Sequence, residues 1–346
     1  MSSSGRVMIY GATGHTGRFV VEELLRRRLT PVLAGRSAAR LAEAARRHDG
    51  LEQRLVGLDD PDRLRRAIDG VDAVVNTAGP FLDTALPLAT AAVASGAHYL
   101  DVTAEQPVVQ ELYRELDRAA RDAGVAVVPA MAFYGGLADL LVTAALDGET
   151  SADAVEIAIG LDHWWPTVGT RITGARNTSI RQIIRAGVLV PLPDPAPTGS
   201  WSYPQPLGEQ PVVQLPFSEV VTINRHLRVG DLTSYLNSSS LADLRDESTP
   251  PPSATDDSGR SAQRFVVDVA VRRGAGTRRL TASGRDIYAV TAPIVVEGVV
   301  RLLGDRHPAG AVAPGEAFDA ADLLAALAAH PAGLTLDTSR VRVAAT

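Results

Sequence analysis

The sequence predicts an α/β fold, in which a doubly wound domain carries an inserted α+β domain with a mainly antiparallel sheet. Over the first 131 residues, short apolar strands alternate with helices whose apolar residues recur at helical spacing. This alternation predicts a parallel sheet with helices on both faces. From residue 132 to about 285, segments of alternating polarity indicate an antiparallel sheet with one wetter face. Apolar helices beyond residue 286 predict a return to the first domain.

The individual elements follow from these patterns. Strands of the first domain are predicted at Arg6–Tyr10, Pro31–Ala34, Gln53–Leu58, Ala73–Thr77, His98–Val102 and Val125–Pro129. Strands of the inserted domain are predicted at Ala154–Gly160 and Arg264–Arg272, and late helices at Ala292–Leu303 and Ala320–Ala329. We therefore expect one domain to comprise residues 1–131 plus 286–346 and the other to comprise residues 132–285.

A glycine-rich loop lies between the first predicted strand and an amphipathic helix. In that setting glycines let backbone N–H groups approach a pyrophosphate, and the helix N-terminus adds partial positive charge. The pattern predicts a Rossmann domain that binds a dinucleotide. Its candidate ligands are Gly11, Thr13, Gly14, His15, Thr16 and Gly17, with His15 as a bystander at the rim.

The residue after the second strand indicates which dinucleotide is bound. Arg36 stands where an acidic residue would bind the ribose of NAD. A guanidinium suits the extra phosphate of NADP, and Ser37 and Arg40 add a hydroxyl and a second cation. The alternative is a solvated Arg36 that pairs with Glu43 or Asp59. We expect the cofactor to be NADP(H).

Two later segments complete the predicted cofactor site. Asp59 follows the third strand and either accepts the adenine amino group or, like Asp60, caps the helix that begins near Pro61. The segment after the fourth strand lies at the carboxyl edge, on the nicotinamide side of a doubly wound sheet. Its candidate cofactor residues are Thr77, Ala78, Gly79 and Pro80.

Composition excludes several classes of chemistry. All 34 basic residues are arginine and the chain has no cysteine, so a Schiff base, a P-loop lysine, a Tyr-x-x-x-Lys pair and a thiolate nucleophile are excluded. The histidines show no metal-ligand spacing, and no metal is expected. The net charge of −6, without a basic block, argues against nucleic acid as a partner. The apolar stretches are too short for membrane insertion, and a cytoplasmic location is expected.

Five segments carry a family resemblance: Gly11–Gly17, Ala34–Ser37, Val75–Phe81, His98–Glu105 and Gly284–Ala292. Together they resemble the saccharopine dehydrogenase-like reductases, over about residues 1–140 and 284–330. The resemblance implies an NADP(H)-linked reductase with a Rossmann domain and an inserted substrate domain. Members of this family, which includes trans-acting enoyl reductases, act on imines that join amino acids and on enoyl groups in lipid assembly.

One segment departs from the family pattern. After the sixth strand the family often has Gly-Phe-Asp-Ser-x-Pro-x-Asp, where this chain has residues 132–139. Tyr134 replaces the first aspartate, and only Asp139 keeps an acid. The resemblance therefore implies a type of reaction and not a substrate.

Three residues are the predicted catalytic candidates. Tyr134 lies just beyond the sixth strand, beside two glycines, where it is placed to donate a proton or polarise an acceptor. Tyr99 and Asp101 flank the end of the fifth strand; we expect them to point to opposite faces, with Asp101 as an orienting acid or a structural partner. We expect Glu105 to start the next helix. In the second domain, Asp162–Trp165 either walls a substrate pocket or packs at a strand end.

The sequence leaves two alternatives for the role of one proline-rich stretch and of three arginines, and it predicts the role of a second proline-rich stretch. Pro191–Pro216 mixes proline with aromatic residues and is either a lid or a surface loop, whereas Leu244–Ser261 is predicted to be a solvated, mobile loop. Arg171, Arg176 and Arg181 either bind carboxylates or form a solvated helix face.

These expectations favour an NADPH-dependent reductase of a polarised double bond in a small metabolite, with secondary metabolites among the candidates. The bond is C=N or C=C, and C=O fits less well because the usual Tyr–Lys partner is absent. The alternative is a redox-silent NADP(H)-binding sensor that regulates a partner. The expected partner is a small-molecule substrate. The second domain's sheet is the candidate surface for a homodimer.

Overall fold

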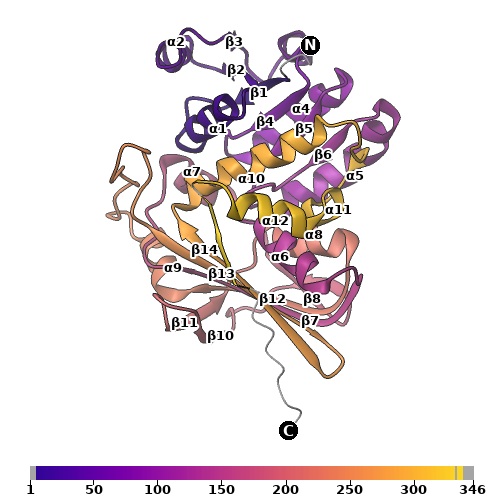
Figure 1. Cartoon of the computed structure of the whole chain (residues 1–346), viewed down its shortest axis with the longest axis vertical. Coiled ribbons are helices and arrows are strands. Elements are labelled where there is room, and N and C mark those ends of the chain that lie inside the picture. The colour runs from indigo at the N-terminus through magenta and orange to yellow at the C-terminus, as the bar shows by residue number, and fades with distance from the viewer. Residues whose placement is uncertain (1–4, 332, 338–346) are drawn as a thin grey trace.

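Two sheets form the framework of the molecule (Figure 1). The computed structural model describes residues 5–331 and 333–337. One sheet has seven parallel strands, and the other is a larger mixed sheet in which most neighbours are antiparallel. The predicted fold class is therefore confirmed.

The parallel sheet has the strand order β15-β6-β5-β4-β1-β2-β3. Apart from the edge strand β3, which is largely exposed, the strands are short and buried, as expected for a sheet covered on both faces. The six strands predicted from the sequence begin and end within a few residues of their predicted bounds, and β15 was not predicted. The strands are β1 (Arg6–Tyr10), β2 (Thr30–Gly35), β3 (Gln53–Leu55), β4 (Ala73–Asn76), β5 (His98–Asp101), β6 (Ala126–Val128) and β15 (Gly310–Ala311).

Helices cover both faces of this sheet. The apolar sides of α1 (His15–Arg26), α2 (Ala38–Arg46) and α10 (Ile287–Leu302) share a core on one face. The other face packs against α3 (Pro61–Ile68), α4 (Phe81–Ala94) and α5 (Gln106–Ala123). The chain thus leaves β1 and β2 toward one face and β4 and β5 toward the other, so the neighbours β1 and β4 mark the switch point of a doubly wound fold.

The second sheet has the order β10-β11-β12-β7-β13-β14-β16; in addition, β8 pairs with β12 and β9 pairs with β8. Only β7 and β12 pair in parallel along this order. We predicted that residues 286–346 belong to the first domain, but β16 pairs with β14 and so joins the second sheet. The strands are β7 (Ser151–Leu161), β8 (Gln182–Arg185), β9 (Val188–Pro191), β10 (Thr198–Ser202), β11 (Glu209–Gln214), β12 (Arg228–Asn237), β13 (Arg264–Arg273), β14 (Gly276–Arg285) and β16 (Thr335–Asp337).

One apolar core joins the two sheets. It runs from Ile9 on the first sheet through Val295 of α10 and Leu140 of α6 (Gly136–Leu146) to Ile157 and Val267 on the second. The remaining helices surround this core and the second sheet. They are α7 (Val168–Arg176), α8 (Glu219–His226), α9 (Ser238–Arg245), α11 (Pro314–Ala317) and α12 (Ala320–Ala328). The shared core fixes the two sheets relative to each other.

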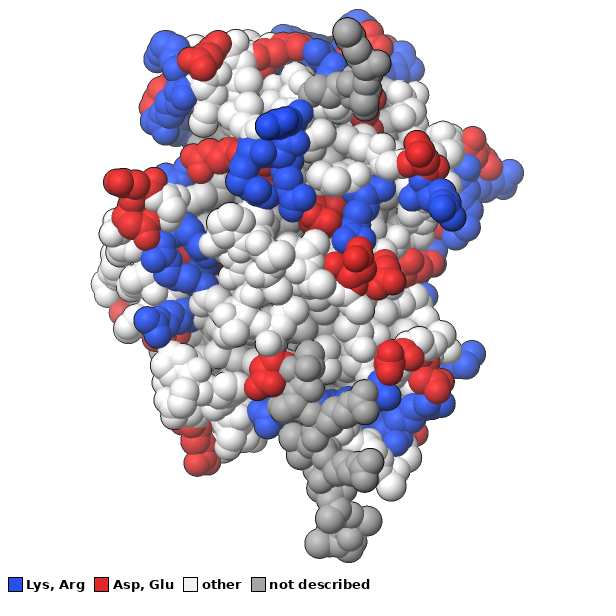
Figure 2. All heavy atoms as spheres, viewed as in Figure 1, with Lys and Arg blue, Asp and Glu red and all other residues white. Residues whose placement is uncertain are grey.

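The surface carries charges of both signs. On the face drawn in Figure 2, arginine side chains are interspersed with aspartate and glutamate. Among the helices of the described residues, none combines the length and apolar character needed to cross a bilayer.

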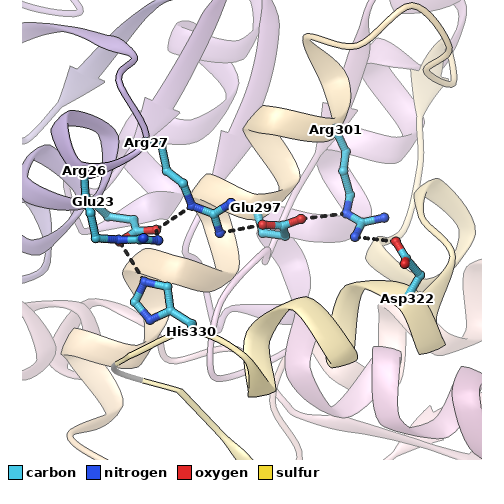
Figure 3. Close-up of polar contacts among 7 residues, drawn as sticks. All are labelled: Glu23, Arg26, Arg27, Glu297, Arg301, Asp322 and His330. Carbon is cyan, nitrogen blue, oxygen red and sulfur yellow. Dashed lines mark hydrogen bonds and ion pairs between the residues drawn. The ribbon is translucent and has the colours of Figure 1, made fainter.

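A network of ionisable side chains ties α1 to the C-terminal helices (Figure 3). Glu23 is at its centre: it is 5% exposed, it accepts hydrogen bonds from Arg26 at 2.6 and 2.7 Å, and it lies 2.9 Å from the imidazole of His330. Arg27 then bridges Glu23 and Glu297 of α10, at 3.0 and 2.6 Å. The network comprises Glu23, Arg26, Arg27, Glu297, Arg301, Asp322 and His330.

We expect the substitution Glu23→Gln to lower the free energy of unfolding by about 1–3 kcal/mol at pH 7, because it weakens buried hydrogen bonds to charged groups. Burial raises the pKa of Glu23, but hydrogen bonds from Arg26, His330 and Arg27 outweigh burial and lower it from 4.5 to about 2. The carboxylate's contribution is therefore complete above pH 4.5 and is lost as the pH falls toward 2.

Urea unfolding of wild type and Glu23→Gln at pH 7 and near pH 2 measures both effects, and the two proteins should converge in acid. Glu22→Gln is the control, since Glu22 is exposed on the same helix. An equal loss of stability in both variants, or a difference that persists in acid, would contradict this assignment.

Candidate functional site

The carboxyl edge of the parallel sheet has a crevice between β1 and β4. These strands are neighbours, and the helices that follow them, α1 and α4, pack on opposite faces. Open α/β sheets bind ligands in the crevice at such a switch point. The loop of residues 11–17 after β1 and the segment of residues 77–80 after β4 therefore meet where a nucleotide would bind.

Two glycines allow this loop to pack tightly. Gly11 has a φ of +90°, and a Cβ there would lie 2.9 Å from the backbone nitrogen of Ala78. A Cβ on Gly17 would lie 2.2 Å from the carbonyl oxygen of Gly11. Gly17 thus serves the close packing of α1 on the loop, and its contact with the cofactor stays a prediction.

The amino end of α1 is open. Gly14 is its N-cap residue and supplies no side-chain hydrogen bond, and the first turn contains no acidic residue. Uncapped N–H groups and the partial positive charge of the helix end suit a phosphate. Thr13, Gly14, His15 and Thr16 all line the cavity at this point.

A cavity of about 750 Å³ extends from this loop to α7 and neighbouring loops of the second domain. Its lining includes most of the residues predicted from the sequence: Gly11, Thr13, Gly14, His15, Thr16, Arg36, Ser37, Arg40, Thr77, Ala78, Gly79 and Tyr134. Five predicted residues lie outside the lining: Gly17, Asp59, Pro80, Tyr99 and Asp101. The cavity volume is within the range of roughly 300–1,000 Å³ that is usual for small-molecule sites.

The outer end of the cavity is basic. Arg36 and Arg40 are exposed there, and Ser37 is the N-cap of α2, where its hydroxyl accepts the N–H of Arg40 at 3.4 Å. Glu43, an alternative partner for Arg36, pairs with Arg47 at 2.5 Å. Among the described residues no carboxylate forms an ion pair with Arg36, so its guanidinium is available to an anionic ligand.

Asp59 is not a helix cap. Asp60 caps α3, since its Oδ1 accepts the N–H of Arg63 at 2.9 Å. Asp59 is exposed near Tyr10. Burial has the largest effect on the pKa of the Tyr10 phenol and raises it; the charge of Arg36 lowers this pKa, and the charge of Asp59 raises it. The contact of Asp59 with adenine stays a prediction.

His15 lies deeper than the predicted rim position. It is partly buried, and the rings of Phe19 and Tyr288 meet it edge-on at 5.5 and 5.3 Å. Its Nε2 is buried without a hydrogen-bond partner. Burial and the charge of Arg18 lower its pKa to about 4, although Asp286 opposes them. At neutral pH His15 is therefore an uncharged ring with one nitrogen left for a ligand.

Tyr99 and Asp101 form a buried network instead of a catalytic pair. Residues two apart on a strand share a face, so the expected opposite orientation was wrong. The hydroxyl of Tyr99 donates to Oδ2 of Asp101 at 3.1 Å, and Oδ1 accepts the N–H groups of Ala130 and Thr103 at 2.8 and 3.0 Å. Burial raises the pKa of Asp101 to about 6 against these hydrogen bonds. The carboxyl group holds the ends of β5 and β6 together.

Aromatic rings and one guanidinium form the inner end of the cavity. Tyr134 stacks on Trp164 with ring centroids 5.4 Å apart, and Phe217 lies 4.3 Å away on a tilted plane. Arg181 lies 4.9 Å above the ring of Phe217. The hydroxyl of Tyr134 is buried without a partner, and burial raises the pKa of this phenol well above its usual 10. Tyr134 thus presents a protonated donor beside a cation.

The three arginines left open by the sequence have different roles. Arg171 donates to backbone carbonyls in the loop of residues 244–252, at 2.9 to 3.4 Å. Arg176 pairs with Asp83 at 3.0 Å. Of the three, only Arg181 lines the cavity. Trp164 also lines it, so part of the Asp162–Trp165 segment does form a pocket wall.

The cavity is covered by segments that the sequence assigned otherwise. Five residues of α7 contribute to its lining, together with Leu244, Pro251 and Pro252. The loop of residues 244–261 is therefore not simply a solvated segment. By contrast, Pro191–Pro216 contributes no lining residue, and its central part forms the β10–β11 hairpin of the second sheet.

Glu105 is a cavity residue whose role the sequence analysis missed. It is 2% exposed and lines the cavity just before α5. Its Oε2 accepts the N–H of Phe81 and the hydroxyl of Thr103, both at 3.2 Å, while Oε1 is buried without a partner. Burial raises its pKa to about 7, although these hydrogen bonds oppose the change. The available signal was its place at the carboxyl edge, within the motif His98–Glu105.

Comparison with known proteins identifies the first domain. Residues 7–128 match the family described as the saccharopine dehydrogenase NADP binding domain. The match is confined to residues 7–128 and therefore concerns the first domain and not the whole chain. The predicted resemblance to the saccharopine dehydrogenase family is confirmed for this domain.

Two relatives show how far the similarity extends. A probable mitochondrial saccharopine dehydrogenase-like oxidoreductase of Arabidopsis thaliana is 31% identical over 142 residues, which cover 37% of this chain and 31% of the relative. A putative trans-acting enoyl reductase of Mycobacterium tuberculosis is 31% identical over 147 residues, covering 40% and 34%. The similarity thus spans about a third of each relative's length.

The similarity of fold extends over nearly the whole chain. The apo saccharopine dehydrogenase (L-Glu forming) of Saccharomyces cerevisiae superposes with a TM-score of 0.67 and 12% identity, covering 97% of this chain and 100% of that structure. At this identity the likeness concerns the fold alone. It nevertheless includes the second sheet, which the family match at residues 7–128 does not reach.

We expect Arg36→Ala to weaken binding of NADPH by about 10- to 100-fold and to leave binding of NADH unchanged, since a hydrogen bond to a charged group contributes roughly 1.5–3 kcal/mol. Calorimetric titration of both nucleotides measures the change. Arg46→Ala is the control, because Arg46 is exposed on the same helix and does not line the cavity. Unchanged NADPH affinity in Arg36→Ala would contradict the assignment.

Proposed function

We propose that the protein is an NADPH-dependent reductase of a polarised C=N or C=C bond in a small molecule. The observation that carries the proposal is the cavity itself, which connects the nucleotide loop of an NADP-binding domain with aromatic and polar side chains of the second domain. An enzyme of this kind needs the two ends of its site to be continuous, because hydride passes directly between cofactor and substrate.

The residues at the nucleotide end fit the cofactor. The loop between β1 and α1 leaves no room for larger side chains at Gly11 and Gly17, the amino end of α1 is uncapped, and His15 retains an unpartnered buried nitrogen. Thr77 to Gly79 would lie along the nicotinamide half, and Arg36 beside the ribose phosphate. When bound, NADPH supplies the hydride.

The residues at the inner end fit a flat, polarised acceptor. The rings of Tyr134, Trp164 and Phe217 offer apolar surface to an unsaturated group. Arg181 and the hydroxyl of Tyr134 are the positive and neutral donors beside them, placed to polarise the double bond and to stabilise charge that develops on it. With no lysine in the chain, the Tyr–Lys arrangement suited to ketones is absent.

The alternative function, a redox-silent NADP(H) sensor, requires the second domain to be turned away from the cofactor loop. Instead, Trp164, Arg181 and Phe217 line the same cavity as Gly14 and Thr16. A site lined by both domains supports the reductase over the sensor.

Wild-type protein is expected to oxidise NADPH in the presence of a cyclic imine such as 1-pyrroline or an enoyl thioester such as crotonyl-N-acetylcysteamine, each at about 1 mM, a typical upper KM. The loss of reduced-nicotinamide absorbance measures the rate. Cyclohexanone serves as the ketone comparison and should react more slowly. No oxidation with any of the three acceptors would count against the proposed function.

Tyr134→Phe is expected to lower kcat by about 100-fold with the reactive acceptor, because it removes one hydrogen-bond donor to charge in the transition state. Binding of NADPH should not change, since Tyr134 lies at the far end of the cavity from Arg36. Tyr235→Phe is the control, as Tyr235 contacts Gln214 and does not line the cavity. Full activity of Tyr134→Phe would show that the phenol has no part in polarising the acceptor.

A further inference from the structure

Glu105 presents a buried carboxyl oxygen for which the fold provides no partner. The side chain is 2% exposed, and Oε2 receives both of its hydrogen bonds, from Phe81 and Thr103. Oε1 has none. Leaving a buried polar atom unpaired costs roughly 1–3 kcal/mol, so such an atom in a cavity wall points to a ligand or to chemistry.

The carboxyl group does not serve the helix that follows it. Glu105 is the N-cap residue of α5, yet its side chain makes no capping hydrogen bond. It binds instead the N–H of Phe81, the first residue of α4, which follows directly on the segment Thr77–Pro80. This contact fixes the acid at the carboxyl edge of β4 and β5, on the nicotinamide side of the switch point.

Resting on the proposed reductase function, we propose that Glu105 is the catalytic acid of this site: Oε1 donates the proton that completes reduction of the double bond. The geometry that supports this role is an acid in the wall of the substrate cavity, held rigidly through one oxygen and unpaired at the other. Tyr134 then acts as the hydrogen-bond donor that polarises the acceptor.

The step balances without another reactant. One atom of the C=N or C=C bond accepts a hydride, with its two electrons, from NADPH, which becomes NADP⁺. The π bond breaks, and its electron pair takes the proton from Oε1 at the other atom. Glu105 is left as a carboxylate, and water restores its proton after the product leaves.

The surroundings of Glu105 favour the protonated form that such a donor needs. Burial is the main cause that raises its pKa to about 7, and the charge of Asp101 on β5 adds to it. The hydrogen bonds from the hydroxyl of Thr103 and the N–H of Phe81 oppose them by stabilising the carboxylate. A pKa near the working pH suits a general acid.

Other ionisable groups approach from each side of the cavity. Arg181 of the second domain and His15 of the nucleotide loop line the same cavity as Glu105. The nearest carboxylate of α4, that of Asp83, is paired with Arg176. The phenol of Tyr134 is a poorer proton source, because its pKa is raised well above 10.

The test is Glu105→Gln, which keeps an oxygen acceptor for the N–H of Phe81 but has no proton to donate at this site. We expect kcat with the reactive acceptor to fall by about 100-fold or more. We expect the Kd of NADPH to stay within twofold and the thermal unfolding midpoint to be unchanged, because the amide keeps the size of the acid and its hydrogen-bond acceptor. Glu111→Gln, on the same helix but outside the cavity lining, should match wild type.

The pH dependence adds a readout that a structural role would not move. Because the acid must be protonated, wild-type kcat should be full below pH 7 and fall as the pH rises through about 7. Glu105→Gln should lose this inflection. A second readout needs no substrate: in protein with ¹³C-labelled glutamate carboxyls, the resonance missing from the Glu105→Gln spectrum should titrate near pH 7.

The outcomes separate the two proposals. If wild-type protein fails to oxidise NADPH with every acceptor tested, both the reductase proposal and the role of Glu105 are wrong. An active wild type, with Glu105→Gln equally active and the same pH profile, defeats only the role of Glu105. A Glu105 resonance that titrates at the usual 4.5 defeats it as well.

Discussion

The whole site depends on the close contact between the first turn of α1 and the loop that precedes it. The carbonyl oxygen of Gly11 lies so near Gly17 that no side chain fits between them, and Gly11 itself abuts Ala78 at the end of β4. These contacts hold the uncapped amino end of α1 directly over the β1–β4 crevice. A methyl group at position 17 would push the helix away and displace the very N–H groups that suit a phosphate. The close packing at Gly17 is therefore needed before the N–H groups of α1 can bind a phosphate.

A second constraint keeps the two halves of the cavity together. In the described residues, one apolar core passes from β1 through α10 and α6 to the second sheet, so the two domains pack on shared side chains. The aromatic wall therefore stands at a fixed distance from the nucleotide loop. Helix α7, which covers the cavity, is not part of this core: it has no buried residue, and contacts of Arg171 and Arg176 hold it in place. Segments with so little buried surface are the first to open locally, which suits a path for substrate.

The sequence was most informative where function and local structure coincide. The parallel strands were predicted closely because buried strands and amphipathic helices alternate, and the nucleotide end because its residues follow a short motif. Tyr134 was found because it lies beside a strand end. Phe217 could not be found in this way, and Arg181 could be named only together with Arg171 and Arg176, because both residues reach the cavity from the second domain. The error at Tyr99 and Asp101 came from ignoring the two-residue period of a strand, which places both side chains on one face.

Asp101 and Glu105 show how surroundings assign different roles to two buried acids four residues apart. Both lie at the end of β5, and burial raises the pKa of each. Asp101 has hydrogen-bond partners at both carboxyl oxygens, and these donors remain in place when it ionises. A substrate could bind to Asp101 only by breaking one of these hydrogen bonds. Glu105 is held at one oxygen only. An acid that is fully paired fastens the fold, whereas an acid with one oxygen unpaired in a cavity wall can exchange its proton without loosening anything around it.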